Sequence, residues 1–195
     1  MTKSEEKQQL RTAIRALIPT LPAAYTTAAD ASIAAHLLAM PEYQAAKTLF
    51  CFVGTTREID TRPILEAALA AGKALCVPLC TGVGTMELRR IFSLSELVSG
   101  TYGILEPTAD CPLVDADEVD LSVLPCLSCN RLGQRLGRGG GFYDRFLSAY
   151  RGGMVLLCRE KCMREELPVE PHDYPVPWVI TEKGLYEDGI PARLG

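Results

Sequence analysis

The chain has 195 residues, of which 48% are hydrophobic and 23% charged, so it can bury a full core and is neither disordered nor collagen-like. Its formal net charge of −4 argues against general nucleic-acid binding. No apolar run is long enough to span a membrane and the polar start MTKSEEKQQ lacks a signal-peptide core, so we expect a cytoplasmic protein with one domain over residues 1–195.

The first predicted element is a helix over residues 3–18, which ends before Pro19. Its apolar positions recur at helical spacing and are Leu10, Ile14, Leu17 and Ile18. Lys7, Arg11 and Arg15 follow one another at intervals of four residues. We expect this cationic row to lie on the face opposite the apolar row, where it could either contact a ligand or be a solvated surface.

Helices and strands alternate along the rest of the chain. Further helices are predicted over residues 26–39, 61–72, 93–97 and 141–150. Strands are predicted over residues 48–53, 73–78, 119–125, 153–158 and 177–180, with turns and short strands over 81–92. Thr61 is a plausible N-cap and Gly72 a plausible C-cap. Short continuous apolar strands separated by helices predict a parallel sheet covered on both faces, the three-layer α/β class.

The segment RLGQRLGRGGGFYDRF combines glycine and arginine between a predicted strand and the helix at 141–150. Five glycines lie between Gly133 and Gly141, and residues 131–151 hold five arginines but one acid. Ligands of open α/β sheets bind beyond the carboxyl ends of strands, where bare glycine N–H groups can converge on an anion. Arg135 and Arg138 can add forked donors, so the segment predicts a phosphate cradle. A flexible loop with solvated arginines is the alternative.

Two carboxylates are candidates for binding Mg²⁺ beside such a cradle. Asp144 directly follows the glycines, and Mg²⁺ in proteins takes one or two carboxylates together with phosphate oxygens. Asp173, in the proline-bounded loop VEPHDYPVP, is a second candidate from a distant part of the chain. On the residues alone, Asp144 is equally suited to an ion pair with Arg138 or Arg145.

The chain has eight cysteines, which in a protein without a signal peptide are more typical of buried thiols than of disulfides. Cys126 and Cys129 in PCLSCN have the spacing of a metal or redox pair. No second such pair and no nearby histidine in the sequence completes a zinc set. We expect structural burial for this pair, with a metal or redox role as the alternative.

Four motifs, in order and over nearly the full length, resemble the 5-formyltetrahydrofolate cyclo-ligase family, also called 5,10-methenyltetrahydrofolate synthetases. PCLSCNRLGQRLGRGGGFYDRFL resembles the glycine-rich signature, and KQQLRTAIRAL resembles the opening helix. TTREIDTRPIL resembles the segment after the first strand, and LPVEPHDYPVPWVITEKGL resembles the closing segment. The resemblance implies a three-layer fold with a mostly parallel sheet flanked by helices, of the NagB/RpiA/CoA transferase-like type.

The resemblance implies an ATP- and Mg²⁺-dependent ligase that converts 5-formyltetrahydrofolate into 5,10-methenyltetrahydrofolate and releases ADP and phosphate. It assigns catalysis to Arg138 and Asp144, the folate's pterin ring to Glu58, and Mg²⁺ to Asp144 and Asp173. The residues assigned to ATP are Lys7, Arg11, Arg135, Leu136, Gly137, Arg138, Gly139, Gly140, Gly141, Phe142 and Tyr143. We expect a monomer whose partners are these small molecules, without nucleic acid or membrane.

Several residues depart from the family pattern, and they leave room for an alternative function. They are Arg57, Cys129, Asn130, Phe142 and Pro177. None of them removes an acidic or basic residue assigned to ATP or Mg²⁺. The alternative is a paralogue of the same fold that binds a nucleotide or folate without catalysis or acts on a different substrate. Glu58 has an alternative too, as a surface acid paired with Arg57 or Arg62.

Overall fold

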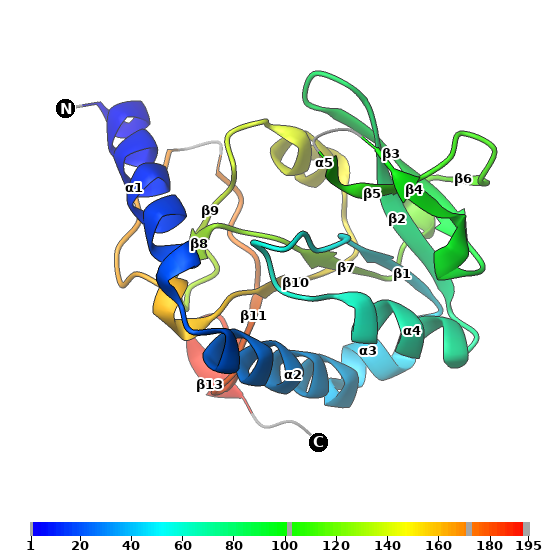
Figure 1. Ribbon diagram of the computed structural model, residues 1–195, viewed down its shortest axis with the longest axis horizontal. Helices are drawn as coiled ribbons and strands as arrows, with labels where there is room; N and C mark the ends of the chain where they lie inside the picture. Colours follow the sequence, from blue (N-terminus) through cyan, green and yellow to red (C-terminus); the bar gives the residue numbers. More distant parts are fainter. Residues whose placement is uncertain (1, 101–102, 171–172, 193–195) are drawn as a thin grey trace.

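The computed structural model describes residues 2–100, 103–170 and 173–192. Its main sheet has nine strands in the order β13-β12-β11-β10-β7-β1-β2-β3-β6 (Figure 1). The bounds of these strands are β1 (Thr48–Cys51), β2 (Ala74–Gly82), β3 (Thr85–Ile91), β6 (Leu113–Val114), β7 (Leu121–Leu124), β10 (Gly153–Leu157), β11 (Trp178–Thr181), β12 (Gly184–Glu187) and β13 (Ile190–Ala192).

The five central strands, β11-β10-β7-β1-β2, are parallel to one another. Their sequences are continuous apolar runs because both faces of the sheet are covered, and all four residues of β7 are buried. Antiparallel strands extend both edges, β3 and β6 on one side and β12 and β13 on the other. The segment at 81–92 therefore forms the long β2–β3 hairpin rather than short strands.

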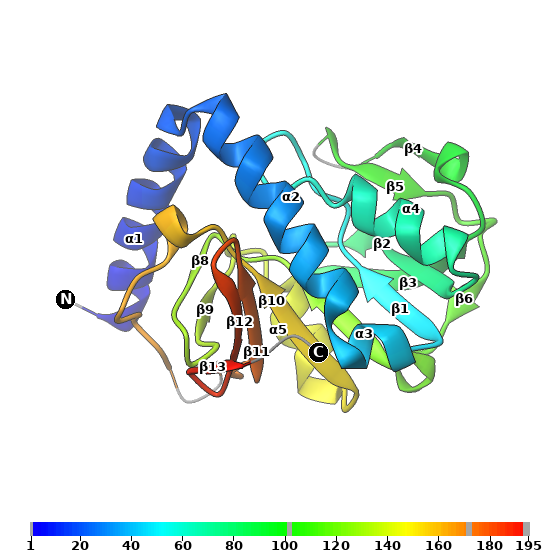
Figure 2. The ribbon, with the colours of Figure 1, turned by 90° about the horizontal axis from the view of Figure 1, so that it is seen from below.

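Helices cover both faces of this sheet. The α-helices are α1 (Lys3–Leu17), α2 (Ala23–Ala39), α3 (Pro41–Ala45), α4 (Arg62–Ala70) and α5 (Phe142–Ala149). Figures 1 and 2 show α2, α3 and α4 on one face and α5 on the other. Ile33 of α2 and Ile64 of α4 belong to one buried cluster, whereas Leu147 of α5 belongs to a second. The predicted three-layer α/β fold, with a mostly parallel central sheet, is confirmed.

Shorter elements complete the fold. The small sheets pair β4 (Leu97–Ser99) with β5 (Leu105–Pro107) and β8 (Ser128–Cys129) with β9 (Arg135–Leu136). The 3₁₀ turns include η1 (Ile18–Thr20), η2 (Leu94–Glu96), η4 (Ala116–Glu118) and η5 (Glu160–Cys162). The small helix predicted at 93–97 is η2, and the helix predicted from Thr26 begins three residues earlier, at Ala23. No helix within the described ranges has the length and apolarity needed to cross a membrane.

The expectation that the cationic row of the first helix lies opposite its apolar row is wrong. At 100° per residue, Lys7, Arg11, Ile14 and Ile18 fall within one narrow arc of the helix. In the structure Lys7 is 8% exposed and Ile14 is fully buried, so both lie on the packed face of α1. The amino-terminal part of this face meets the loops around the glycine-rich segment, which makes the cations part of an internal contact.

Candidate active site

A pocket of about 400 Å³ lies where the segments that follow β1 and β7 meet the glycine-rich segment. The first of these segments contributes Phe52 and Val53, and the second contributes Pro125 and Cys126. Residues 137–144 form a continuous part of the lining. The pocket therefore occupies the position at the carboxyl ends of parallel strands where ligands of open α/β sheets bind.

The lining of the pocket has a charged part and an apolar part. The charged side chains are Arg15, Glu58, Glu106, Arg135, Arg138 and Asp144. The apolar part adds Pro78, Cys80, Met86 and Ile104 to the residues after β1 and β7. Such a combination suits ligands that carry both an anionic group and a ring system.

The glycine-rich loop, residues 137–141, is shaped by left-handed backbone and held by helix α1. Gly139 has φ +97° and Gly141, the N-cap of α5, has φ +73°, a region that residues with a Cβ rarely adopt. Arg11 donates from Nε to the Gly137 carbonyl at 3.0 Å, and Arg15 donates from Nη2 to the Arg138 carbonyl at 2.8 Å. Two of the loop's carbonyls are therefore held by side chains of α1, which favours a fixed loop over the flexible alternative.

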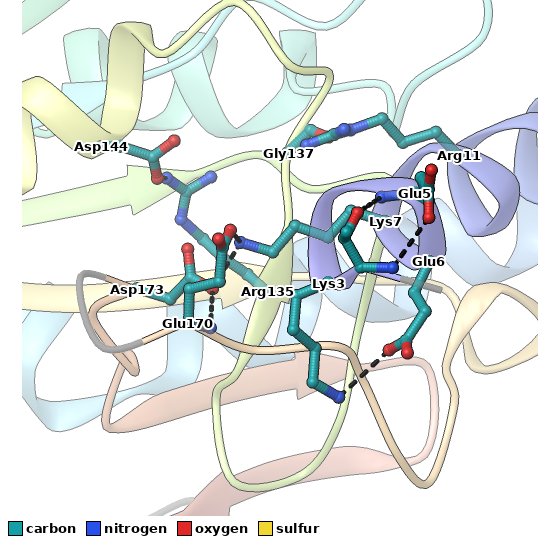
Figure 3. Close-up of polar contacts among 11 residues, drawn as sticks. Lys3, Glu5, Glu6, Lys7, Arg11, Arg135, Gly137, Asp144, Glu170 and Asp173 are labelled. Atoms are coloured by element: carbon teal, nitrogen blue, oxygen red, sulfur yellow. Dashed lines mark hydrogen bonds and ion pairs between the residues drawn. The ribbon is translucent and has the colours of Figure 1, made fainter.

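The charged residues assigned to the site form ion pairs with one another. Arg138 Nε lies 2.9 Å from Glu58 Oε1, and Arg135 pairs with Asp144. Lys7 Nζ lies 2.6 Å from both Glu170 Oε2 and Asp173 Oδ2. Figure 3 shows Lys7 reaching from α1 to Glu170 and Asp173, with the Arg135–Asp144 pair nearby in the view.

These partners differ from the simple alternatives that the sequence offers. Glu58 pairs with Arg138 instead of Arg57 or Arg62, and Asp144 pairs with Arg135 instead of Arg138 or Arg145. Each pair joins residues from different elements.

The pocket brings together most, but not all, of the residues that the sequence analysis assigns. Glu58, Arg135 and the continuous run 137–144 line it. The assigned residues that are not among its lining are Lys7, Arg11, Leu136 and Asp173. Leu136 is 2% exposed in β9, so its side chain is a core residue. Arg11 contacts the loop backbone from the side of α1.

Burial and hydrogen bonding shift the pKa values of several groups near the pocket. Burial raises the pKa of Tyr143 well above its ordinary value. Hydrogen bonds with Cys129 and Cys158 hold the pKa of the Cys126 thiol below its ordinary value. The net pKa of Lys7 is raised: burial lowers it, but the hydrogen bonds to Asp173 and Glu170 raise it by more. Lys7 is therefore a fixed cation over the physiological range.

Two acidic or basic lining residues were not assigned from the sequence. Arg15 carried a usable signal, because it continues the spacing of Lys7 and Arg11 along the helix. Glu106 is 4% exposed in β5 and accepts a hydrogen bond from the Cys80 amide at 3.2 Å. Its strand is three residues long and lies in a turn-rich region, so no periodic pattern pointed to it.

Comparison with known proteins agrees with the geometry of the pocket and identifies one family. The profile of the 5-formyltetrahydrofolate cyclo-ligase family matches residues 3–182. The chain is 32% identical over 160 residues to 5-formyltetrahydrofolate cyclo-ligase of Escherichia coli K12, covering 79% of this chain and 88% of that protein. It is 29% identical over 209 residues to the mitochondrial 5-formyltetrahydrofolate cyclo-ligase of Arabidopsis thaliana, covering 93% of this chain and 76% of that protein.

Two solved structures are similar over almost the whole chain. The 5,10-methenyltetrahydrofolate synthetase of Aquifex aeolicus superposes with a TM-score of 0.81 at 27% identity, covering 100% of this chain and 97% of that chain. The 5,10-methenyltetrahydrofolate synthetase of Mycoplasma pneumoniae superposes with a TM-score of 0.70 at 16% identity, covering 93% and 99%. The second likeness shows a shared fold.

Proposed function

The chain belongs to the 5-formyltetrahydrofolate cyclo-ligase family, and from this premise we propose that it converts 5-formyltetrahydrofolate into 5,10-methenyltetrahydrofolate while ATP is converted into ADP and phosphate. The observation that carries the proposal is one pocket with two kinds of lining. A glycine-rich loop with Arg135 and Arg138 suits phosphates, and an apolar part with Glu58 suits a pterin ring.

The chemistry calls for such a pocket. A formamide is a poor electrophile because its nitrogen donates into the carbonyl, and its oxygen is a poor leaving group. Transfer of the γ-phosphoryl group of ATP to the formyl oxygen gives an iminium phosphate, which N10 of the folate attacks, and phosphate then leaves as the ring closes. The protein must hold two anionic ligands in line and offset charge on the transferring group, which arginines and backbone N–H groups do.

Within this proposal each part of the lining has a role. The N–H groups of residues 139–141 and of the first turn of α5 bind phosphate oxygens. Arg138 exchanges its ion pair with Glu58 for the transferring phosphoryl group, and Glu58 then accepts hydrogen bonds from the pterin. Arg11 and Arg15 hold the loop carbonyls, which keeps the N–H groups oriented. Lys7 is a longer-range positive charge beside the phosphates.

The residues present also fit a magnesium ion. The Asp144 side chain is 53% exposed and lines the same pocket as the glycine-rich loop, so one carboxylate oxygen is available beside phosphate. Asp144 would hold the ion, with Asp173 as the second carboxylate on exchange of its Lys7 contact. Bound there, Mg²⁺ supplies positive charge that offsets the charge of the phosphates.

The experiment that tests the proposal follows the absorbance of 5,10-methenyltetrahydrofolate as it forms from 5-formyltetrahydrofolate. Purified protein is given ATP and Mg²⁺, with matched reactions that lack ATP or contain EDTA. We expect product only where both ATP and the metal are present. A folded sample that binds ATP or the folate by calorimetry but forms no product contradicts the proposal and supports the non-catalytic or substrate-shifted paralogue.

A further inference from the structure

Three cysteine thiols converge behind the wall of the pocket. Cys126 follows β7, Cys129 ends β8 and Cys158 follows β10. Their Sγ atoms all lie within 4.8 Å of one another. The Cys126–Cys129 spacing is visible in the sequence, but Cys158 is brought to the pair by the parallel contact between β7 and β10. The structure thus supplies a third ligand that the sequence spacing did not reveal.

The three thiols are enclosed by the protein, are not oxidised and lie close to a positive charge. Cys129 is fully buried and Cys158 is 3% exposed, whereas Cys126 also lines the pocket. All three are free thiols. Arg135 pairs with Cys129 across the β8–β9 ladder, which brings a positive charge to the cluster. Burial as a small apolar side chain explains a single cysteine in the core. It does not explain why three sulfur atoms from three different segments lie next to one another.

We propose that Cys126, Cys129 and Cys158 form a binding site for a thiophilic d¹⁰ cation, with Zn²⁺ as the ion. Zinc–sulfur bonds are about 2.3 Å long, which in a tetrahedron separates the sulfurs by about 3.8 Å. The Sγ atoms lie within 4.8 Å of one another, so the cluster would contract by up to about 1 Å to bind the ion. Three protein ligands leave a fourth position for water or a pocket ligand, the arrangement of an open zinc site.

The charge and proton balance of binding is simple. The ion replaces the protons of the thiols, which leave to solvent, and no oxidant or reductant takes part. Three thiolates and one Zn²⁺ leave a net charge of −1 beside the Arg135 guanidinium, which also pairs with Asp144. Sulfur ligands select such an ion over Mg²⁺, which prefers oxygen, so the site is separate from the carboxylates. Because Cys126 lines the pocket, an ion here would rigidify the segment between β7 and β8.

The test titrates the reduced, metal-free chain with Zn²⁺ against a chromogenic chelator, and with Cd²⁺ while ultraviolet thiolate-to-metal absorption is followed. We expect one ion per chain. Cys126→Ser should weaken Zn²⁺ binding by at least about 100-fold, more than the loss of a group that only orients a ligand. Cys111→Ser is the control, because Cys111 is a buried cysteine outside the cluster that contacts Thr108, and this variant should bind Zn²⁺ as the parent does.

A second measurement needs no variant and so does not depend on how well one folds. Zn²⁺ should protect the peptides containing Cys126, Cys129 and Cys158 from alkylation in the unaltered chain, and leave the alkylation of Cys111 unchanged. The proposal is overturned if the reduced chain takes up no Zn²⁺, if Cys126→Ser binds it as tightly as the parent, or if Asp144→Asn abolishes the uptake. A disulfide between two of the three cysteines in a chain that takes up no Zn²⁺ after reduction also overturns it.

Discussion

At the scale of single residues, most charged side chains in and beside the pocket form ion pairs with one another. Arg138 pairs with Glu58 and Arg135 with Asp144, while Lys7 pairs with two carboxylates. The exposure of these pairs differs widely. The Arg138 side chain is 48% exposed, whereas that of Lys7 is 10% exposed. Exposed ion pairs contribute little to the free energy of unfolding, whereas removal of one member of a buried pair lowers it by several kcal/mol. Substitutions of Arg138 and of Lys7 should therefore have different effects on stability.

If the proposed function holds, Arg138→Ala should lower kcat by about 100-fold or more with little loss of stability, because it removes the charge-assisted donor that we propose for the transferring phosphoryl group. Steady-state kinetics of methenyl product formation, with thermal unfolding alongside, measure both effects. Arg151→Ala is the matched control. It lies in the same arginine-rich segment but donates to the carbonyls of Ser148 and Tyr150 at the end of α5. Equal kinetics for the two variants would remove Arg138 from the mechanism.

Lys7→Met should lower the free energy of unfolding by about 3 kcal/mol near neutral pH, because Glu170 and Asp173 lose the cation between them. The pKa of Lys7 is raised above 10.5, so its contribution is full below pH 10.5 and is lost as the pH rises through the raised value. Urea unfolding of both proteins at about pH 8 and about pH 11 should show the difference shrinking.

The control for this pair is Lys3→Met, since Lys3 pairs with Glu6 at 3.0 Å but its side chain is 57% exposed. It should change the free energy of unfolding by less than about 0.5 kcal/mol. A Lys7→Met difference that stays constant across the pH range would contradict the assignment of Lys7 as a stabilising cation.

At the scale of elements, the sequence pattern predicts those helices and strands whose formation depends on neighbouring residues in the chain. The buried runs of β1, β7 and β10 and the helix from Arg62 follow from hydrophobic continuity and capping residues. The sequence analysis does not predict strands β12 and β13. They are only four and three residues long, they pair at one edge of the sheet, and β13 contains a proline. Short edge strands carry no period long enough to detect.

The candidate site divides in the same way. The glycine-rich loop was predictable because its chemistry is contiguous in the sequence. The ion pairs were not, since Lys7 and Asp173 are separated by 166 residues and Glu58 reaches Arg138 only through the fold. The expectation that the cations of α1 lie opposite its apolar residues is wrong because Lys7 and Ile14 lie within one arc of the helix, although each belongs to a different row in the sequence.

Helix α1 is expected to act as a support for the glycine-rich loop. Arg11→Ala removes a charged donor to the Gly137 carbonyl, an interaction worth about 1.5–3 kcal/mol. Hydrogen exchange of the Leu127 amide, which donates to the Leu136 carbonyl directly before the loop at 2.8 Å, should therefore become about 10- to 100-fold faster. Gln9→Ala, on the exposed face of the same helix, should leave the exchange unchanged. Unaltered exchange in Arg11→Ala would mean that α1 does not hold the loop.

At the scale of the whole molecule, one buried ion pair joins the segment that carries Glu58 to the helical layer. Arg159, after β10, donates to both oxygens of Asp30 on α2, each at 2.7 Å. Arg159 also donates to the Glu58 carbonyl at 2.8 Å, and Asp30 accepts from the Asp60 amide at 2.9 Å. The segment that presents Glu58 is therefore fixed by a pair whose members are 129 residues apart.

Asp30→Ala should lower the free energy of unfolding by about 3–5 kcal/mol, because a buried guanidinium is left with an incomplete set of acceptors. Fluorescence of Trp178, the one tryptophan of the chain, reports unfolding in denaturant. Glu66→Ala, which breaks the exposed pair between Arg62 and Glu66 at 3.6 Å, should change this free energy by less than about 0.5 kcal/mol. Similar losses in the two variants would contradict a structural role for the buried pair.

The ion pair between Arg138 and Glu58 has a consequence for how the two substrates affect each other. Under the proposed function, a folate that hydrogen-bonds Glu58 would release Arg138 for ATP, and ATP that takes Arg138 would release Glu58 for the folate, so each ligand would remove a competitor of the other. Thermodynamic linkage makes this heterotropic cooperativity reciprocal, and a pair in which the Arg138 side chain is half exposed should give about a 5-fold gain in affinity each way. In Glu58→Gln, whose amide is a weaker partner for the guanidinium, ATP binding should become less dependent on the folate. The pocket thus pairs its own charges with one another, and under the proposed function the binding of one substrate would free a residue that the other substrate needs.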